Sequence, residues 1–141
     1  KDSNYNIITL FHSLEHVHNI EDLFYHINRV SEKDAKMIIA VPNINASEIK
    51  FLTNKWVAWD VPRHLYHFSP KTLAALLDKY GWKIIQSKSM LQDTLFNIYM
   101  SLEGSFIKKT FLFILLLGYS LISQFLFSNK QSTNLVICQK K

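Results

Sequence analysis

The chain of 141 residues is long enough for one domain with a hydrophobic core, and its 48% hydrophobic and 19% charged residues exclude an intrinsically disordered chain. Its net charge of +5 is scattered rather than gathered into basic runs, which argues against nucleic-acid binding. The single cysteine, Cys138, excludes an internal disulfide and a zinc cluster built from cysteines.

The first part of the chain predicts a strand, a helix and a second strand. Tyr5–Phe11 is apolar and β-branched, which favours a strand buried on both faces, as in a parallel sheet. Asn19 can cap a helix over residues 20–30, where apolar residues recur with the spacing of one buried face. After a polar turn at residues 32–34, Met37–Val41 predicts a second buried strand.

The second part continues the same alternation after a long connection over residues 44–68. Ser69 can cap a second helix, and Gly81 suits the position just after its end. Trp82–Ser87 predicts a third strand, and Leu135–Cys138 predicts a fourth near the end of the chain. The alternation indicates an α/β fold with a parallel or mostly parallel sheet and helices on its faces.

Ligands of such sheets bind beyond the carboxyl ends of the strands. Two segments fall there: residues 12–18 after the first strand, and residues 42–68 after the second. The second segment leads into WDVPRHLYHFSP (Trp59–Pro70), which packs histidines, an arginine and aromatic residues into a short irregular stretch. Because loops carry chemistry more often than the elements they connect, this stretch is a candidate substrate site.

Three segments in this order resemble the C-terminal half of a class I S-adenosylmethionine-dependent methyltransferase domain. They are IITLFHSLEHV (Ile7–Val17), MIIAVPN (Met37–Asn43) and WDVPRHLYHFSPKTLAALLDKYGW (Trp59–Trp82), and the closing STNLVICQKK is similar to the last strand of that fold. The resemblance implies a partial Rossmann-like sheet, strands four to seven of seven, with flanking helices. Residues 1–141 would then form the C-terminal part of a single methyltransferase-like domain.

The same resemblance implies that most of the S-adenosylmethionine site lies outside this chain. The family binds the cofactor with a glycine-rich loop after strand one and an acidic residue after strand two. The glycines here, Gly81, Gly104 and Gly118, are not neighbours and cannot form such a loop. We therefore expect an incomplete cofactor site. We also expect an exposed apolar edge at residues 5–11, which would recruit the N-terminal half of the domain or a second copy of the chain.

In the resembling enzymes the turn after the first of these strands borders the reacting methyl group, which places Phe11 and His12 near the cofactor. His12 or His16 could act as a general base on an acceptor hydroxyl. Some quinone O-methyltransferases hold a divalent cation in a similar turn with two carboxylates and a histidine. Glu15 and His16 match that pattern, but His12 stands in place of an acidic residue, so no metal is expected. The structural alternative is that Glu15 and His16 only shape the turn.

The aromatic loop would supply the rest of the acceptor site. Arg63 could pair with an anionic acceptor, and His64 could polarise or deprotonate it. The residues expected to bind substrate are Glu15, Trp59, Arg63, His64 and Tyr66, and those expected to be catalytic are His12, His16 and His64. The alternative reading is structural, with the aromatic residues folding the loop onto the sheet and Arg63 tied to Asp60.

Residues 104–130 are predicted to form an apolar helical insertion. Within it, Thr110–Phe127 has eighteen residues and no charge, which just reaches the length of a membrane span. A span is disfavoured because Leu135–Cys138 must return to the sheet. Helices packed against the domain and a helix lying in a membrane interface both remain open. Interfacial binding would favour a lipid-like acceptor.

The sequence therefore predicts methyl transfer from S-adenosylmethionine to a small-molecule or lipid-linked acceptor, with this chain supplying mainly the acceptor side. A non-catalytic methyltransferase-like binding module and a membrane-associated interaction protein are the alternatives. The polar start of the chain lacks the features of a signal peptide, which favours a cytoplasmic protein, with a peripheral membrane location as an open alternative.

Overall fold

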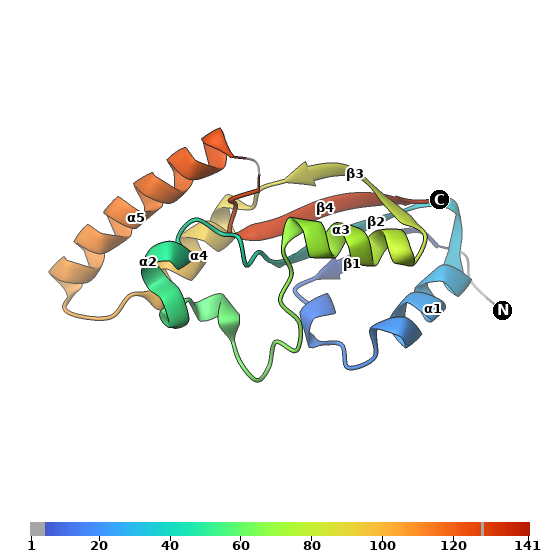
Figure 1. Ribbon diagram of the computed structural model, residues 1–141, viewed down its shortest axis with the longest axis horizontal. Coiled ribbons are helices and arrows are strands. Elements are labelled where there is room, and N and C mark those ends of the chain that lie inside the picture. Colours follow the sequence, from blue (N-terminus) through green and yellow to red (C-terminus); the bar gives the residue numbers. More distant parts are fainter. Residues whose placement is uncertain (1–4, 128) are drawn as a thin grey trace.

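The computed structural model of the chain describes residues 5–127 and 129–141. Its strands are β1 (Tyr5–Phe11), β2 (Ser31–Pro42), β3 (Trp82–Lys88) and β4 (Thr133–Lys140). Its helices are α1 (Ile20–Val30), α2 (Ile49–Leu52), α3 (Pro70–Lys79), α4 (Leu91–Ser101) and α5 (Phe106–Leu126). Short 3-10 turns cover Leu14–His16, Thr53–Lys55 and Val57–Trp59. The α/β class and the partial Rossmann-like sheet are confirmed (Figure 1).

The four strands form one mixed sheet in the order β1-β2-β4-β3. β1 and β2 are parallel, with Leu10 opposite Ile39. β4 enters between β2 and β3 and runs antiparallel to both, with Cys138 opposite Met37 on one side and Ile84 on the other. The sheet is therefore mostly parallel in strand direction, but its last strand is reversed.

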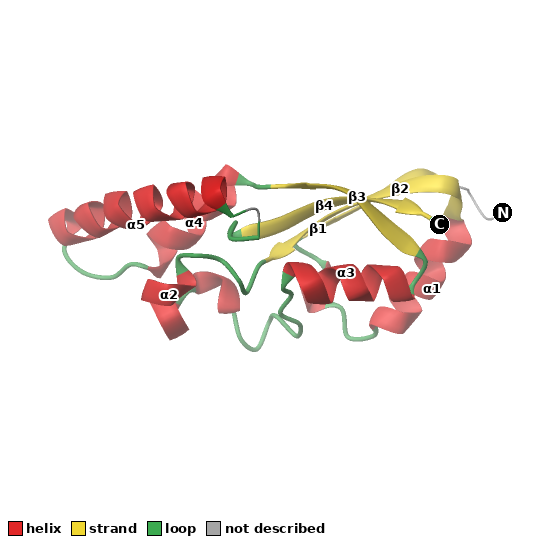
Figure 2. Ribbon diagram, turned by 45° about the horizontal axis from the view of Figure 1, so that its top comes forward, coloured by secondary structure: helices red, strands yellow, loops and turns green. Residues whose placement is uncertain are grey.

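Helices α1 and α3 lie on the same face of the sheet (Figure 2). Their apolar faces bury Phe24, Leu73 and Leu77 against Met37 and Ile39 of β2. Local sequence signals place both helices where they were predicted. The Asn19 side chain accepts a hydrogen bond from the Asp22 backbone N–H, and Ser69 forms a reciprocal capping box with Thr72.

The strand at residues 5–11 has the predicted bounds but not the predicted burial. β1 is an edge strand, and its residues Ile7 and Phe11 are exposed. Burial on both faces was therefore the wrong expectation for this strand, because α1 and α3 cover only the face that carries Ile8 and Leu10. The expectation of an exposed apolar edge is confirmed; its recruitment of further strands stays a prediction.

The polar segment at residues 32–34 is not a separate turn, as predicted, but part of β2, which is longer than Met37–Val41. The pairing with β1 shifts between Tyr5 and Ile7, and Asp34 has a positive φ of 64°. The segment is thus a bulge-like irregularity within β2, because backbone pairing with β1 continues on both sides of it.

Helix α5 extends from the end of the sheet, beside α4 and α2 (Figure 1). The buried residues of α5 are Ser120 and Ser123, whereas most of its large apolar side chains are exposed. Tight packing of this apolar run against the domain, one of the two open expectations, is therefore wrong for the described chain. By length and composition α5 could cross a membrane. Its status as an insertion stays a prediction.

Candidate functional site

A cavity of about 540 Å³ opens at the carboxyl ends of β1 and β2, where the sequence places its candidate residues. Its walls come from the turn after β1, the end of β2, the long connection and α4. The polar residues that line it are His12, His16, Asp60, Arg63, His64, Asp93 and Asn97. The structure therefore brings together all three histidines that were predicted to be catalytic.

His12 follows the last residue of β1 and bridges two carboxylates. Its Nε2 lies 3.0 Å from Asp93 Oδ2, and its Nδ1 lies 3.5 Å from Glu15 Oε1. The hydrogen bond to Asp93, followed by the interaction with Glu15, raises the pKa of His12 to about 9. His12 therefore carries a proton at neutral pH, and the predicted role as a general base is not supported for it.

Asp93 stands at the start of α4 and is held on its other side by Thr133, whose hydroxyl donates a hydrogen bond of 2.6 Å to Asp93 Oδ2. The hydrogen bonds from His12 and Thr133 lower the pKa of Asp93, although burial, the largest single effect, opposes them. Asp93 is therefore an ionised partner that fixes the His12 ring at the cavity wall.

Glu15 links the two loops of the site. Its backbone carbonyl accepts hydrogen bonds from the N–H groups of Leu65 (2.8 Å) and Tyr66 (3.3 Å), which dock the aromatic loop onto the turn after β1. The Glu15 side chain is fully buried, and neither carboxylate oxygen accepts a hydrogen bond from a described residue. His12 Nδ1 at 3.5 Å is an ion-pair contact, longer than an ordinary N–H···O bond.

His16 and His64 are held from behind by backbone carbonyls. Nδ1 of His16 lies 2.9 Å from the Arg63 carbonyl oxygen, and Nδ1 of His64 lies 2.9 Å from that of Ala58. A carbonyl oxygen only accepts, so each Nδ1 carries the proton, and Nε2 keeps its lone pair in the neutral ring. The two rings meet edge to face with centroids 4.7 Å apart.

Arg63 lies at the mouth of the cavity, with three quarters of its side chain exposed. Its Nε lies 3.3 Å from Asp60 Oδ2, as the structural reading of the loop predicts. Asp60 Oδ2 also lies 3.9 Å from His64 Nε2. The remaining guanidinium nitrogens leave Arg63 able to meet an anionic acceptor, so its predicted role in substrate binding stays a prediction.

Four predicted site residues do not line the cavity: Phe11, Glu15, Trp59 and Tyr66. Trp59 lines a separate open groove of about 900 Å³, and its indole N–H donates to the Thr53 carbonyl. The Tyr66 hydroxyl reaches toward the His18 carbonyl at 3.5 Å, and Phe11 is exposed on the edge strand. Of the residues expected to bind substrate, Arg63 and His64 line the cavity, whereas Glu15 is fully buried and contacts the lining residue His12.

Sequence reasoning missed the wall that α4 supplies, with Asp93, Phe96 and Asn97. These residues belong to the segment between the third and fourth strands, which carries no motif of the resembling family. An acidic residue in the first turn of a helix that follows a strand was the available signal for Asp93. Its pairing with His12 depends on how α4 packs against the end of the sheet.

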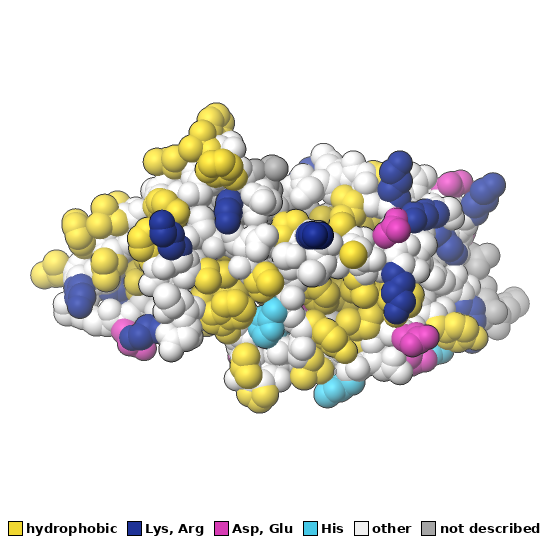
Figure 3. Space-filling view, in the orientation of Figure 1, with side chains coloured by type: hydrophobic (Ala, Val, Ile, Leu, Met, Phe, Trp, Pro, Cys, Tyr) yellow, Lys and Arg dark blue, Asp and Glu magenta, His cyan; other side chains and the backbone are white. Residues whose placement is uncertain are grey.

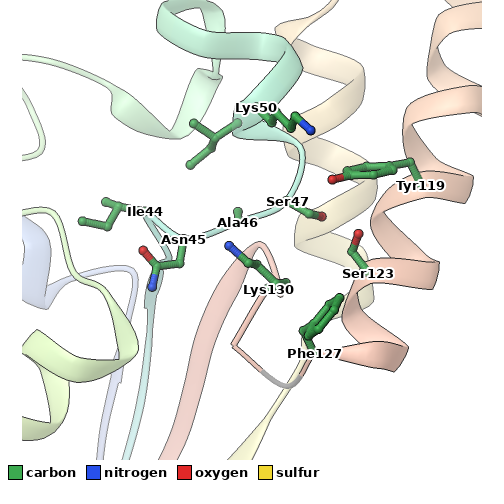
Figure 4. Close-up of a pocket in the computed structure, with 10 residues that line it drawn as sticks. Ile44, Asn45, Ala46, Ser47, Lys50, Tyr119, Ser123, Phe127 and Lys130 are labelled. Atoms are coloured by element: carbon green, nitrogen blue, oxygen red, sulfur yellow. The ribbon is translucent and has the colours of Figure 1, made fainter.

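A second cavity, of about 300 Å³, lies between α5 and the loop that leads into α2. Tyr119, Ser123 and Phe127 project from α5 and its end toward Ser47 and Lys130 (Figure 4). This cavity contains none of the predicted catalytic residues, and it belongs to the attachment of α5.

Glu48 forms the polar centre of that attachment. Its fully buried carboxylate accepts hydrogen bonds from Ser120 (3.1 Å), Ser47 (3.5 Å) and Ser132. Gln124 extends the network by donating to Ser120. The polar side of α5 therefore faces the protein, where these hydrogen bonds hold it together with the packing of Leu116 against the cluster around Trp56.

A family model described as a methyltransferase domain matches residues 1–87, more than half of the chain. Among curated proteins, none matches the chain. The fold is similar to that of a protein from Galdieria sulphuraria assigned as a sarcosine dimethylglycine methyltransferase (12% identity, TM-score 0.57, 100% of this chain and 55% of the other). It is also similar to the [4+2]-cyclase SpnF (10% identity, TM-score 0.55, 99% and 50%).

A third similar structure is phosphoethanolamine N-methyltransferase 2 of Haemonchus contortus, solved with phosphomonomethylethanolamine and S-adenosylhomocysteine (13% identity, TM-score 0.52, 97% and 33%). At these identities the likeness concerns the fold alone. The chain spans between a third and about half of the length of these structures, 33% to 55%.

Proposed function

Because the chain belongs to the family of methyltransferase domains, we propose that it supplies the acceptor side of methyl transfer from S-adenosylmethionine. The observation that carries this proposal is the cavity at the ends of β1 and β2, where His16, Arg63 and His64 converge. A cofactor loop uses glycines so that its backbone can approach the cofactor closely, and none of the residues lining this cavity is a glycine. The cavity therefore fits an acceptor better than the cofactor.

The side chains suit an acceptor with a hydroxyl group. In the transfer, the acceptor oxygen attacks the methyl carbon, the bond from that carbon to the sulfonium sulfur breaks, and the acceptor proton passes to a base. His16 and His64 hold lone pairs on Nε2 and line the cavity, so either ring can take that proton when Nε2 is free. The protonated His12 instead contributes positive charge beside the reacting oxygen.

We further propose that the acceptor is lipid-linked. The support is the distribution of side chains on α5, where large apolar residues face outward; they include Phe106, Ile107, Ile114, Ile122 and Phe125. Hydrophobic side chains gather over this end of the molecule (Figure 3). A helix that lies in a membrane surface on this face would bring a lipid-linked acceptor close to the cavity.

The edge of β1 is the proposed docking place of the cofactor-binding half. Its main-chain groups on the side away from β2 face no strand of the described sheet, and Ile7 and Phe11 are exposed beside them. Pairing with further strands there would satisfy the backbone and cover the apolar side chains. We expect weak or no S-adenosylmethionine binding by residues 1–141 alone.

The test uses the protein as its complete gene encodes it, with S-adenosylmethionine carrying a labelled methyl group. We expect the label to enter a product in a lipid extract of the source cells rather than in an aqueous extract. His64→Ala should lower the rate at least about tenfold, whereas the exposed control His26→Ala should leave it unchanged. Labelling of only aqueous products would contradict the lipid-linked acceptor, and no labelling in either extract would contradict methyl transfer.

A further inference from the structure

Three side chains, two of which line the cavity, form a set of possible metal-binding donors. Glu15, His16 and His64 each offer one donor atom, and these atoms all lie within 4.8 Å of one another. We propose that these three residues bind a divalent transition-metal ion of the zinc type. Two imidazole nitrogens and one carboxylate match the three protein ligands of catalytic zinc sites, which leave a further position open.

The Glu15 carboxylate is the first independent support for this site. It is fully buried, and neither of its oxygens accepts a hydrogen bond from a described residue. A buried carboxylate without such partners is costly, and a bound cation is a common way to satisfy it. His12 approaches Oε1 only to 3.5 Å, which leaves the second oxygen, Oε2, without a partner in the described chain.

The two imidazoles each make a hydrogen bond of the kind that metal-ligating histidines make. A ligating histidine usually donates its other ring N–H to a carbonyl or carboxylate, which fixes the tautomer and the ring direction. His16 and His64 both make this bond, through Nδ1 to the carbonyls of Arg63 and Ala58 at 2.9 Å. His16 of the turn after β1 bonds to Arg63 of the aromatic loop, and His64 belongs to that loop, so the turn and the loop hold the donors jointly.

The three donor atoms would have to move closer together to bind one zinc ion. Zinc bonds of about 2.0–2.2 Å in a tetrahedral arrangement place donor atoms roughly 3.3–3.6 Å apart, somewhat closer than the 4.8 Å limit within which these donors lie. Side-chain rotations that move the donor atoms by about 1 Å close that gap, and the cavity beside the two imidazole rings leaves room for such rotations.

The charges around the site favour a dication. Three carboxylates lie at or beside the donors, those of Glu15, Asp60 and Asp93. The guanidinium of Arg63 beside Asp60 is largely exposed and screened by solvent. A divalent ion therefore enters a site whose fixed charge attracts it.

The open position of the metal would face the cavity in which the acceptor is proposed to bind. A divalent ion would lower the pKa of a hydroxyl bound to it, so the acceptor proton would pass to solvent water and no histidine base would be needed. This consequence rests on the proposed function, whereas the metal site itself rests on the donors alone. Metal binding is therefore measured without cofactor or acceptor.

The experiment titrates chelator-treated protein, as its complete gene encodes it, with Co²⁺ and follows the visible absorption of the ion. We expect one Co²⁺ per chain with the absorption of a four- or five-coordinate site, displaced by Zn²⁺. Glu15→Gln, His16→Ala and His64→Ala should each weaken binding at least about tenfold. His26→Ala, in which the exposed partner of Asp22 is removed, is the matched histidine control and should bind like the unchanged protein.

A measurement on the unchanged protein guards against variants that misfold. Zinc binding should shift the Nε2 resonances of His16 and His64 and leave those of His26 in place, as seen by nitrogen NMR. Absence of stoichiometric binding, binding that His64→Ala leaves intact, or shifts confined to other histidines would each overturn the site. Stoichiometric metal binding by a protein that transfers no methyl group to either extract would count against the proposed function alone.

Discussion

Helices α3 and α5 distribute their side chains in opposite ways. α3 buries Leu73 and Leu77 against the sheet and exposes its charged residues. α5 buries Ser120 and Ser123 and exposes most of its large apolar residues. The contrast teaches that the apolar side of a helix faces the protein only where an apolar surface is available to receive it. α5 meets the protein through a polar network and a few partly buried side chains such as Leu116, so most of its large apolar residues are left for another environment.

The largest expected difference between the two helices is in stability. Leu77→Ala removes a fully buried side chain from the core and should lower the free energy of unfolding by about 2–5 kcal/mol. Ile114→Ala, at an exposed position of α5, should change it by less than about 0.5 kcal/mol. Urea denaturation of both variants measures the difference. Similar losses would mean that α5 is packed in solution.

The next effect concerns the polar attachment of α5. Glu48→Ala removes the acceptor that Ser120 and Ser132 share, and leaves their buried hydroxyls without it. We expect a loss of about 1–3 kcal/mol and faster amide hydrogen exchange in α5 than in α3. Glu103→Ala is the control, because that carboxylate pairs with Lys55 at the surface. Unchanged exchange in α5 would show that other contacts hold the helix.

A smaller effect tests what the exposed side of α5 meets. The triple variant Ile114→Ser, Ile122→Ser and Phe125→Ser should bind anionic liposomes at least about tenfold more weakly, because three apolar side chains no longer enter the lipid. The control Ile7→Ser and Ile85→Ser changes exposed apolar residues of the sheet instead. Cosedimentation measures both. Equal binding by the two variants would contradict a membrane-facing α5.

The smallest effect is the pH dependence that His12 contributes at the cavity. Its pKa in the folded chain is about 9, above the ordinary value of 6.5, because Asp93 and Glu15 stabilise the charged ring. The resulting stabilisation is complete below about pH 6.5 and is lost as pH rises through about 9. His12→Gln should flatten this part of the stability profile, as measured by thermal denaturation. A profile that the substitution leaves unaltered would contradict the pairing.

Much of the fold was predictable because its signals are local. The cap at Asn19, the capping box at Ser69 and the apolar periodicity of α1 and α3 act within single helices, and they gave the helix starts correctly. The turn at residues 32–34 was wrong because pairing with β1 overrode a polar local preference.

The candidate site was predictable only in part. His12, His16 and His64 followed from their place after strands of an α/β sheet, and all three line the cavity. The prediction for Trp59 was wrong because the composition of the loop does not tell whether the ring lines the cavity or the separate groove. Asp93 was missed because its contact with His12 depends on the packing of α4.

By itself the sequence determined the α/β class, the two amphipathic helices and the resemblance to methyltransferase domains. Only the tertiary structure decided that β4 runs antiparallel between β2 and β3, and that Glu15, His16 and His64 come together. It alone decided that α5 turns its serines inward. The physical reason is that periodicity and capping act over a few neighbouring residues, whereas strand order, donor clusters and helix orientation depend on contacts between distant segments.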